Sequence, residues 1–329
     1  MTDTWFWQRA GMRAALAFGA ATAGGLKAGK LTMDPMMSAL VRFVRRLPAK
    51  APAPQSGAGL GPMRTQYAAA LGITGLRPTP GVSDRPWGSV AAGAREYRPA
   101  RRHRGTLLYF HGGGFIMGSP ATHDGLCRRL AAVSGLRVIS AGYRLAPEHP
   151  YPAAHDDAQA ALAAIRKEEA GRLIVGGDSA GANLAASLAR DGEVDGQFLL
   201  YPVVDMVQSP GRYPSLETFS TGYLLTAAAM EQCATALIPP GVSRDEPRLS
   251  PIRADLTRAA PAVIVVAGFD PLADQGRAFA SALRAAGRPA ELIEEMGLVH
   301  GFADFAGVVP AARRAVDRLG AALGRMVPA

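Results

Sequence analysis

The residues best suited to chemistry lie in the stretch 172–189, RLIVGGDSAGANLAASLA. Its letters GDSAG, centred on Ser179, match the pattern G-x-S-x-G between a strand-like apolar run and an alanine-rich helical run. A serine at such a turn has a strained backbone and an exposed Oγ, and the flanking glycines leave room where strand and helix meet. The pattern alone is common by chance, but this strand–turn–helix context favours Ser179 as a nucleophile.

A serine hydroxyl is a poor nucleophile, so it needs a general base, and the base needs an orienting acid. On a strand–turn–helix scaffold of this kind, the chain order is Ser, then Asp or Glu, then His. Only one of the six histidines, His300, follows Ser179. It lies in the loop GLVHGF (297–302), just after an apolar run. We therefore predict that His300 is the base.

Two aspartates compete for the role of the orienting acid in the stretch VIVVAGFDPLADQG (263–276). Asp270 directly follows a strand run and precedes Pro271, which ends that strand. Asp274 begins the next helix, where a carboxylate is stabilised simply by free backbone N–H groups and the helix dipole. An orienting acid belongs on the strand-end loop, so the sequence favours Asp270.

The stretch YFHGGGFIMGS (109–119) follows another apolar run. Glycines let the backbone approach a ligand without obstruction by a Cβ, and an HGGG loop at this place supplies oxyanion-binding amides. We predict the N–H groups of Gly113, Gly114 and Ala180 as the donors. A phosphate-binding loop is disfavoured because no Lys-Ser/Thr follows and the G-x-G-x-x-G spacing fails at Met117. His111 is interpreted as structural.

The elements that must position these residues follow a regular alternation from about residue 104. Apolar runs typical of buried strands alternate with helix-length, alanine-rich stretches, which predicts a mostly parallel sheet covered on both faces. The predicted strands are 106–110, 136–140, 172–176, 197–201, 262–268 and 290–295, and the predicted helices are 121–134, 153–170, 180–190, 274–286 and 311–325. Residues 205–250 interrupt the alternation with one helix-like piece, TAAAMEQCATALI, and read as a lid.

Composition excludes several other classes. The 329 residues are 48% hydrophobic, enough for one sizeable core, and the net charge of +9 is dispersed in short arginine pairs. Without a basic block or a zinc-finger spacing, we expect no nucleic-acid partner. Cys127 and Cys233 fit no metal spacing and are expected to be free thiols, although the sequence also allows a disulfide between them. Residues 48–62 are rich in Pro, Ala and Gly and are predicted to form a linker.

The first 26 residues leave three interpretations open. The segment AALAFGAATAGGL (14–26) is too short to span a membrane, but basic residues precede it and Ala21-Thr22-Ala23 resembles a cleavage site. It can therefore be a secretory signal, a surface anchor or a helix packed on the body of the protein. We expect a cytoplasmic protein. The sequence does not determine the oligomeric state, and a homodimer is among the states it allows.

Taken together, the segments HGGGFIMGS, YRLAPEHPYPAAHDDA (143–158), GDSAG, SPIRADL (250–256), DPLADQG and HGF resemble the bacterial hormone-sensitive-lipase-like (family IV) esterases of the α/β-hydrolase superfamily. They occur in the order of that family and span residues 105–305. The resemblance implies an eight-stranded, mostly parallel sheet with a helical cap. It also implies that 1–55 and 205–250 form the cap and that 56–204 and 251–329 form the core.

The resemblance implies a serine carboxylesterase with a Ser179–Asp270–His300 triad, which acts on esters with short to medium acyl chains and needs neither metal nor cofactor. Tyr143, Arg144 and Glu148 match a stretch of the family that we interpret as scaffold. The same triad could instead serve an amidase, a lactonase or an acyltransferase, because side chains of the cap choose the substrate. A non-catalytic small-molecule receptor on this fold is the remaining alternative.

Overall fold

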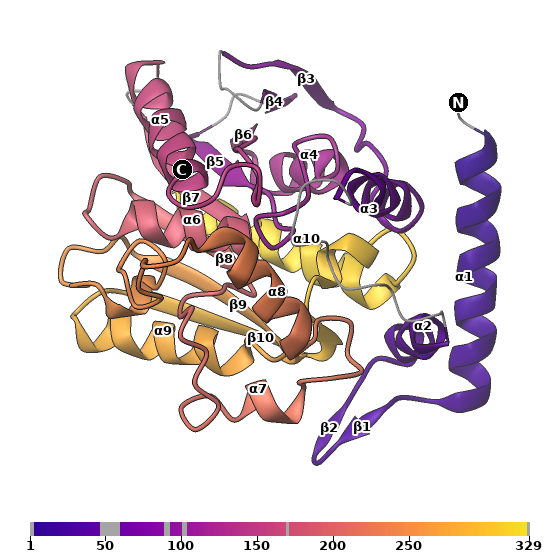
Figure 1. The fold of residues 1–329 in the computed structure, drawn as a ribbon. Helices are drawn as coiled ribbons and strands as arrows, with labels where there is room; N and C mark the ends of the chain where they lie inside the picture. The colour runs from indigo at the N-terminus through magenta and orange to yellow at the C-terminus, as the bar shows by residue number, and fades with distance from the viewer. Residues whose placement is uncertain (1–2, 47–59, 89–92, 101–103, 169–170, 328–329) are drawn as a thin grey trace.

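An eight-stranded sheet forms the centre of the computed structural model, which describes residues 3–46, 60–88, 93–100, 104–168 and 171–327 (Figure 1). The strand order is β10-β9-β8-β7-β5-β6-β4-β3, parallel from β10 to β6, with β4 and β3 antiparallel. The strands are β3 (Val82–Pro86), β4 (Ala94–Pro99), β5 (Thr106–Phe110), β6 (Arg137–Ala141), β7 (Leu173–Asp178), β8 (Gly196–Leu200), β9 (Ala262–Phe269) and β10 (Ala290–Val299). The predicted mostly parallel, eight-stranded architecture is confirmed.

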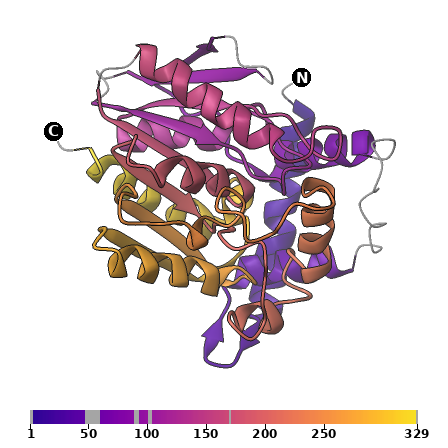
Figure 2. The same ribbon diagram turned by 60° about the vertical axis from the view of Figure 1, so that its left-hand side comes forward.

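Helices cover both faces of this sheet, which is why its central strands are apolar along their whole length. One apolar core lies under α5 (Ala153–Glu168), α6 (Ala180–Ala189) and α9 (Ala273–Ala285), which stand in front of the strands in Figure 2. The core on the opposite face lies under α4 (Asp124–Ser134) and α10 (Pro310–Arg325). The register places Phe110 opposite Gly177, so the glycine loop and the serine turn leave the sheet side by side.

The six strands and five helices expected from the alternation are present within a few residues of their predicted bounds. Strands β3 and β4 were not predicted, because their sequences carry charged residues in place of an apolar run. The predicted linker 48–62 lies outside the described residues up to position 59, and its last three residues already belong to α3 (Leu60–Thr74).

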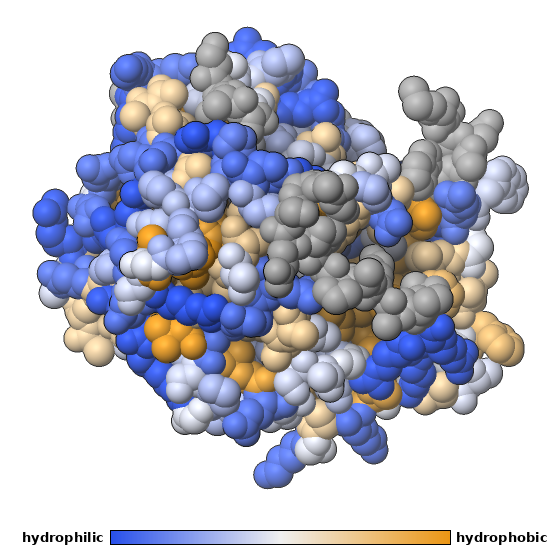
Figure 3. Space-filling model, viewed as in Figure 1, coloured by the Kyte–Doolittle hydropathy of each residue, from blue (hydrophilic) through white to orange (hydrophobic). Residues whose placement is uncertain are grey.

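The N-terminal segment forms a long helix at the side of the molecule, α1 (Asp3–Ala23), followed by a hairpin of β1 (Lys27–Ala28) and β2 (Leu31–Thr32) and by α2 (Pro35–Arg45). Leu16 of α1 is buried, and the Arg9 guanidinium donates to the carbonyls of Gly72 and Ile73 at the end of α3. Trp7 and Phe18 are 71% and 73% exposed, and hydrophobic side chains lie among hydrophilic ones on this side (Figure 3). Among the described residues, no helix is long and apolar enough to cross a membrane.

The interrupting segment contains two helices, α7 (Ser215–Thr218) and α8 (Ala227–Leu237). Helix α8 begins where the Thr226 side chain accepts a hydrogen bond from the Ala229 amide at 3.1 Å, a favourable N-cap. A short 3-10 helix, η2 (Pro251–Arg253), leads back to the sheet, and another, η3 (Phe302–Phe305), follows β10. The division into cap and core by residue number stays a prediction.

The antiparallel edge of the sheet is held by a buried ion cluster. Glu96 on β4 is fully buried and accepts hydrogen bonds from Arg137 on β6, from Arg85 on β3 and from Arg98 at 2.9 Å. Burial opposes ionisation, but the hydrogen bonds and charges of these arginines hold the pKa of Glu96 below its usual value. The cluster therefore joins the two strands that apolar patterning does not specify.

We predict that Glu96→Ala lowers the free energy of unfolding by about 3 kcal/mol, because it leaves the buried Arg137 guanidinium without its main counter-charge. Urea denaturation measures the change. The control is Glu291→Ala, which removes an exposed ion pair with Arg325 and should cost less than about 1 kcal/mol. Equal effects of the two substitutions would contradict this account of the edge.

Candidate active site

Ser179 occupies the sharp turn between β7 and α6. Its φ of 53° is unusual for a residue with a side chain, and such strain is found mostly at functional sites. The amide of Ser179 is fixed by the Leu200 carbonyl at 2.9 Å. A Cβ at Gly177 or Gly181 would overlap the backbone of the neighbouring Phe110, so both flanking glycines are required sterically. The turn presents the Ser179 Oγ beyond the carboxyl ends of the strands.

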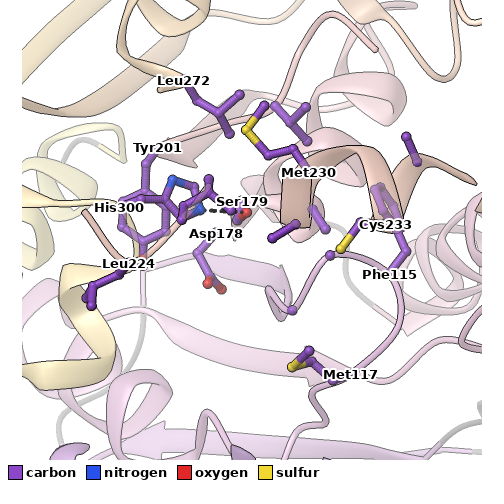
Figure 4. Close-up of a pocket in the computed structure, with 18 of the residues that line it drawn as sticks. Phe115, Met117, Asp178, Ser179, Tyr201, Leu224, Met230, Cys233, Leu272 and His300 are labelled. Atoms are coloured by element: carbon purple, nitrogen blue, oxygen red, sulfur yellow. Dashed lines mark hydrogen bonds between the residues drawn. The ribbon is translucent and has the colours of Figure 1, made fainter. Parts of the chain in front are cut away.

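His300 lies beside this hydroxyl (Figure 4), and Asp270 lies on the other side of the His300 ring. The Nε2 of His300 lies 2.9 Å from Ser179 Oγ, and its Nδ1 lies 2.8 Å from Asp270 Oδ2. Asp270 follows β9, is fully buried, and accepts a further hydrogen bond from the Leu272 amide on its other oxygen at 2.7 Å. The competing Asp274 points elsewhere, because it pairs with Arg277 and accepts from the Ser215 amide, each at 2.8 Å.

The loop after β5 places backbone amides next to Ser179. Gly113 and Gly114 have φ values of 115° and 63°, which favour glycine strongly. A Cβ at Gly113 would overlap the Met117 carbonyl, and one at Gly114 would overlap the Cys233 sulfur on α8. Neither amide has a hydrogen-bond partner among the described residues, and the amide of Ala180, first in α6, has no acceptor within its helix. These are the three donors predicted from the sequence.

The buried carboxylate of Asp178 holds the glycine loop after β5 in place. Asp178 Oδ1 accepts hydrogen bonds from the Gly112 amide at 2.9 Å and from the Tyr109 hydroxyl at 2.7 Å, and His123 Nε2 lies 3.3 Å away. Burial opposes the ionisation of Asp178, but His123 and Tyr109 lower its pKa. Burial alone would also lower the pKa of His123, yet the Asp178 carboxylate raises it above 6.5. Each group therefore favours the charged form of the other.

His111 fixes the same loop from the other side, as expected for a structural residue. Its ring stacks on Tyr143 at a centroid distance of 4.3 Å, and the Tyr143 hydroxyl donates to the His111 carbonyl at 2.8 Å. Burial, followed by the charge of His123, lowers the pKa of His111 to about 3, so its ring stays neutral. Arg144, which is also interpreted as scaffold, forms an ion pair with Asp157.

Ser179 and His300 open into a cavity of about 330 Å³. Its walls are mostly apolar, and α8 covers it with Met230, Cys233 and Leu237, two of which are labelled in Figure 4. Burial raises the pKa of the Cys233 thiol to about 11, so that side chain is neutral and acts as an apolar wall. No group of three or more His, Cys, Asp or Glu side chains in the described parts of the chain is placed to hold a metal ion.

Sequence reasoning missed several residues that line this cavity or support it. Tyr67 comes from α3, far from every motif, and Tyr201 and Asp304 follow β8 and His300. Asp178 lies inside the serine motif, but nothing in that motif reveals that it holds the glycine loop. His123 lies within the predicted helix 121–134, where a single histidine is weak evidence of a functional role.

Several known proteins are similar to this chain. A model of the α/β-hydrolase fold family matches residues 107–304. The chain is 43% identical to the carboxylic ester hydrolase LipN of Mycobacterium tuberculosis over 229 residues, which are 64% of this chain and 60% of LipN. It is 40% identical to the esterase LipI of the same organism over 253 residues, which are 71% of this chain and 78% of LipI.

Solved structures resemble the whole fold. The hyperthermophilic esterase of the archaeon Pyrobaculum calidifontis superposes with a TM-score of 0.78 at 35% identity, covering 87% of this chain and 97% of that one. The family match spans more than half of the sequence. The chain therefore belongs to the α/β-hydrolase family, in the hormone-sensitive-lipase-like branch that its motifs resemble.

The His123–Asp178 pair gives a prediction for pH. Because the folded protein raises the pKa of His123, the pair stabilises the fold fully below about pH 6.5, the ordinary histidine value, and loses that contribution as pH rises through the raised value. We expect His123→Gln to cost most stability in acidic solution and progressively less from pH 6 to pH 9, measured by urea denaturation. Ser187→Ala, which removes no titratable group, is the control and should cost the same throughout this range. A constant cost for His123→Gln would contradict the charged pair.

Proposed function

We propose that the protein hydrolyses carboxylic esters through a covalent intermediate on Ser179. The observation that carries the proposal is the unbroken line of hydrogen-bonding contacts from Asp270 through His300 to Ser179. Asp270 Oδ2 lies 2.8 Å from His300 Nδ1, and His300 Nε2 lies 2.9 Å from Ser179 Oγ. Nucleophile and base within hydrogen-bond reach, with the base oriented by a third group, are the signature of activated serine catalysis. The names of the relatives LipN and LipI, an ester hydrolase and an esterase, support the choice of ester.

In the first half-reaction, Ser179 Oγ attacks the ester carbonyl carbon while His300 Nε2 takes the hydroxyl proton. Asp270 holds the ring so that Nε2 faces the serine, and its charge stabilises the imidazolium that forms. Collapse of the tetrahedral intermediate breaks the bond to the alcohol oxygen, and His300 gives this oxygen the proton. Water then attacks the acyl-enzyme by the same route and releases the acid.

The amides of Gly113, Gly114 and Ala180 would bind the oxygen that becomes negative in each tetrahedral intermediate. None of them has another hydrogen-bond partner among the described residues, and backbone donors that are already fixed in place need no reorganisation when the charge develops. The mostly apolar cavity of about 330 Å³ supports esters with short to medium acyl chains. We infer further that α8 and its surrounding segment 205–250 act as the cap that selects them, together with residues 1–55.

The nucleophile is tested by Ser179→Ala, which we expect to reduce kcat on a short-chain nitrophenyl ester by roughly 10⁴- to 10⁶-fold. Ser187→Ala, on the same helix but outside the cavity, is the matched control and should leave kcat within about twofold. A fluorophosphonate should label one serine per chain in the native protein and none in the Ser179 variant. Full turnover by Ser179→Ala would rule out the proposal.

The oxyanion donors are tested by Gly113→Ala. The new Cβ would displace the loop from the Met117 carbonyl, and loss of one donor lowers kcat by about 10²- to 10³-fold. Gly135→Ala is the matched control, because Gly135 also has a positive φ, 71°, but open space around its Cα. Gly135→Ala should lose about 1–2 kcal/mol of stability and keep its turnover. Gly113→Ala should lose turnover, and its stability should fall further because the new Cβ also overlaps the Met117 carbonyl. Normal kcat in a folded Gly113→Ala protein would refute these donors.

A further inference from the structure

The cavity at Ser179 has two chemically different sides. One side is apolar and consists of α8 side chains such as Met230 and Cys233. The other side carries Tyr67 from α3, Tyr201 from the end of β8 and Asp304 from η3, which we call the polar wall. In Figure 4, Tyr201 stands next to His300, and Met230 and Cys233 lie across the cavity. The catalytic steps described above assign no task to these three polar side chains.

Of the three residues of the polar wall, Tyr201 is the one whose ring contacts His300. Its ring meets that of His300 edge-on at a centroid distance of 4.9 Å, and the residue is 1% exposed. Its hydroxyl is buried and has no hydrogen-bond partner among the described residues. Burial, and then the nearby carboxylates of Asp178 and Asp304, raise the pKa of Tyr201 well above its usual value, so the group remains an O–H donor.

An unsatisfied buried hydroxyl is destabilising, and proteins usually satisfy such groups with an ordered water when other polar partners are near. Those partners are present here. The Tyr67 hydroxyl donates to Asp304 Oδ2 at 3.2 Å, which fixes the Asp304 side chain. The two tyrosines and Asp304 line the same cavity as Ser179 and His300, so the polar wall supplies both donors and acceptors for a water beside the base.

Asp304 also borders a cavity other than the one at Ser179. It lines a second cavity of about 580 Å³ between α3 and the start of α4, whose walls include Arg9, Thr122 and His123. Asp304 is thus shared by the cavity at Ser179 and by this more polar one. Burial, opposed by His123 and His300, raises the pKa of Asp304 to about 6, so at neutral pH its carboxylate is mostly an acceptor of hydrogen bonds.

We propose that Tyr67, Tyr201 and Asp304 bind and orient the water that hydrolyses the acyl-enzyme. This inference rests on the proposed function, and it makes the three side chains positioning residues for the second half-reaction only. The apolar side holds the acyl chain, and the polar wall holds the water next to His300.

The step balances as an ordinary acyl transfer. The water oxygen attacks the acyl carbonyl carbon, and His300 Nε2 takes one of its protons. The bond from that carbon to Ser179 Oγ then breaks, and His300 returns the proton to the serine oxygen. The product is the carboxylic acid. Acylation needs no water, so the polar wall should affect deacylation and leave the attack by Ser179 largely unchanged.

The experiment measures how the acyl-enzyme divides between water and an added alcohol. Nitrophenyl acetate is turned over in the presence of 1-butanol, and the ratio of butyl acetate to acetic acid is determined. This ratio depends only on steps after acylation. We expect Tyr201→Phe, which keeps the ring against His300, to raise the ratio by about fivefold to tenfold, the effect of losing one hydrogen bond. The rate of the first nitrophenol release should stay within about twofold.

Asp304→Leu should raise the ratio in the same way, and Asp304→Asn, which keeps an acceptor oxygen, should raise it less. The control is Tyr97→Phe, because Tyr97 is buried, donates its hydroxyl to Asp124 at 3.1 Å and lies outside both cavities. It should leave the ratio unchanged. An unchanged ratio in Tyr201→Phe and Asp304→Leu would overturn the inference, and so would an equal fall of acylation and deacylation.

Failure of the proposed function has a different readout. In that case the native protein itself would release no nitrophenol and would not react with a fluorophosphonate at Ser179. If the native protein shows both reactions and only the butanol ratio is insensitive to the polar wall, Ser179 chemistry stands and the water site is refuted.

Discussion

The site depends on one buried charge, the carboxylate of Asp178, which adjoins Ser179 in the chain and supports the glycine loop in space. Burying a carboxylate is unfavourable unless hydrogen bonds and a counter-charge compensate. Here the Gly112 amide and the Tyr109 hydroxyl donate hydrogen bonds to Asp178, and the His123 ring lies 3.3 Å from it. These groups belong to β5, to the loop after it and to the start of α4. A single carboxylate thus locks the serine turn and the oxyanion loop into one rigid unit, as preorganised catalysis requires.

The sequence predicts those parts of the site that are fixed by constraints between residues close together in the chain. The turn at Ser179 is specified within five residues, because only glycines fit beside it, and chain order then left His300 as the one available base. Asp270 was chosen over Asp274 by its place at a strand end, and the observed contacts of both agree with that choice. Strands β3 and β4 escaped because Glu96 and its arginines, which no apolar pattern reveals, hold them together.

The polar wall could not be predicted for a different reason. Tyr67 lies over 100 residues before Ser179, Tyr201 follows β8, and Asp304 lies in η3 outside the motifs that the sequence singles out. Their relation arises only when α3 packs against η3 and brings the Tyr67 hydroxyl to Asp304. Nothing local requires a tyrosine or an aspartate at these positions. Sequence patterns therefore identify the residues proposed to break and form bonds. The side chains around them, which determine the reaction partner, are brought together only by tertiary packing.

The difference between bond-forming residues and their surroundings helps to explain why the cavity has an apolar side and a polar side. A wholly apolar cavity would bind the acyl chain well but would leave the acyl-enzyme dry, so an alcohol arriving along the apolar wall would compete with water for it. A wholly polar cavity would admit water but weaken both acyl binding and the oxyanion contacts, which are strongest where water is excluded. Helix α8 and the polar wall line the same cavity as His300, and Tyr201 of the polar wall contacts the His300 ring. Because both half-reactions use His300, each of them has the surroundings that its chemistry requires.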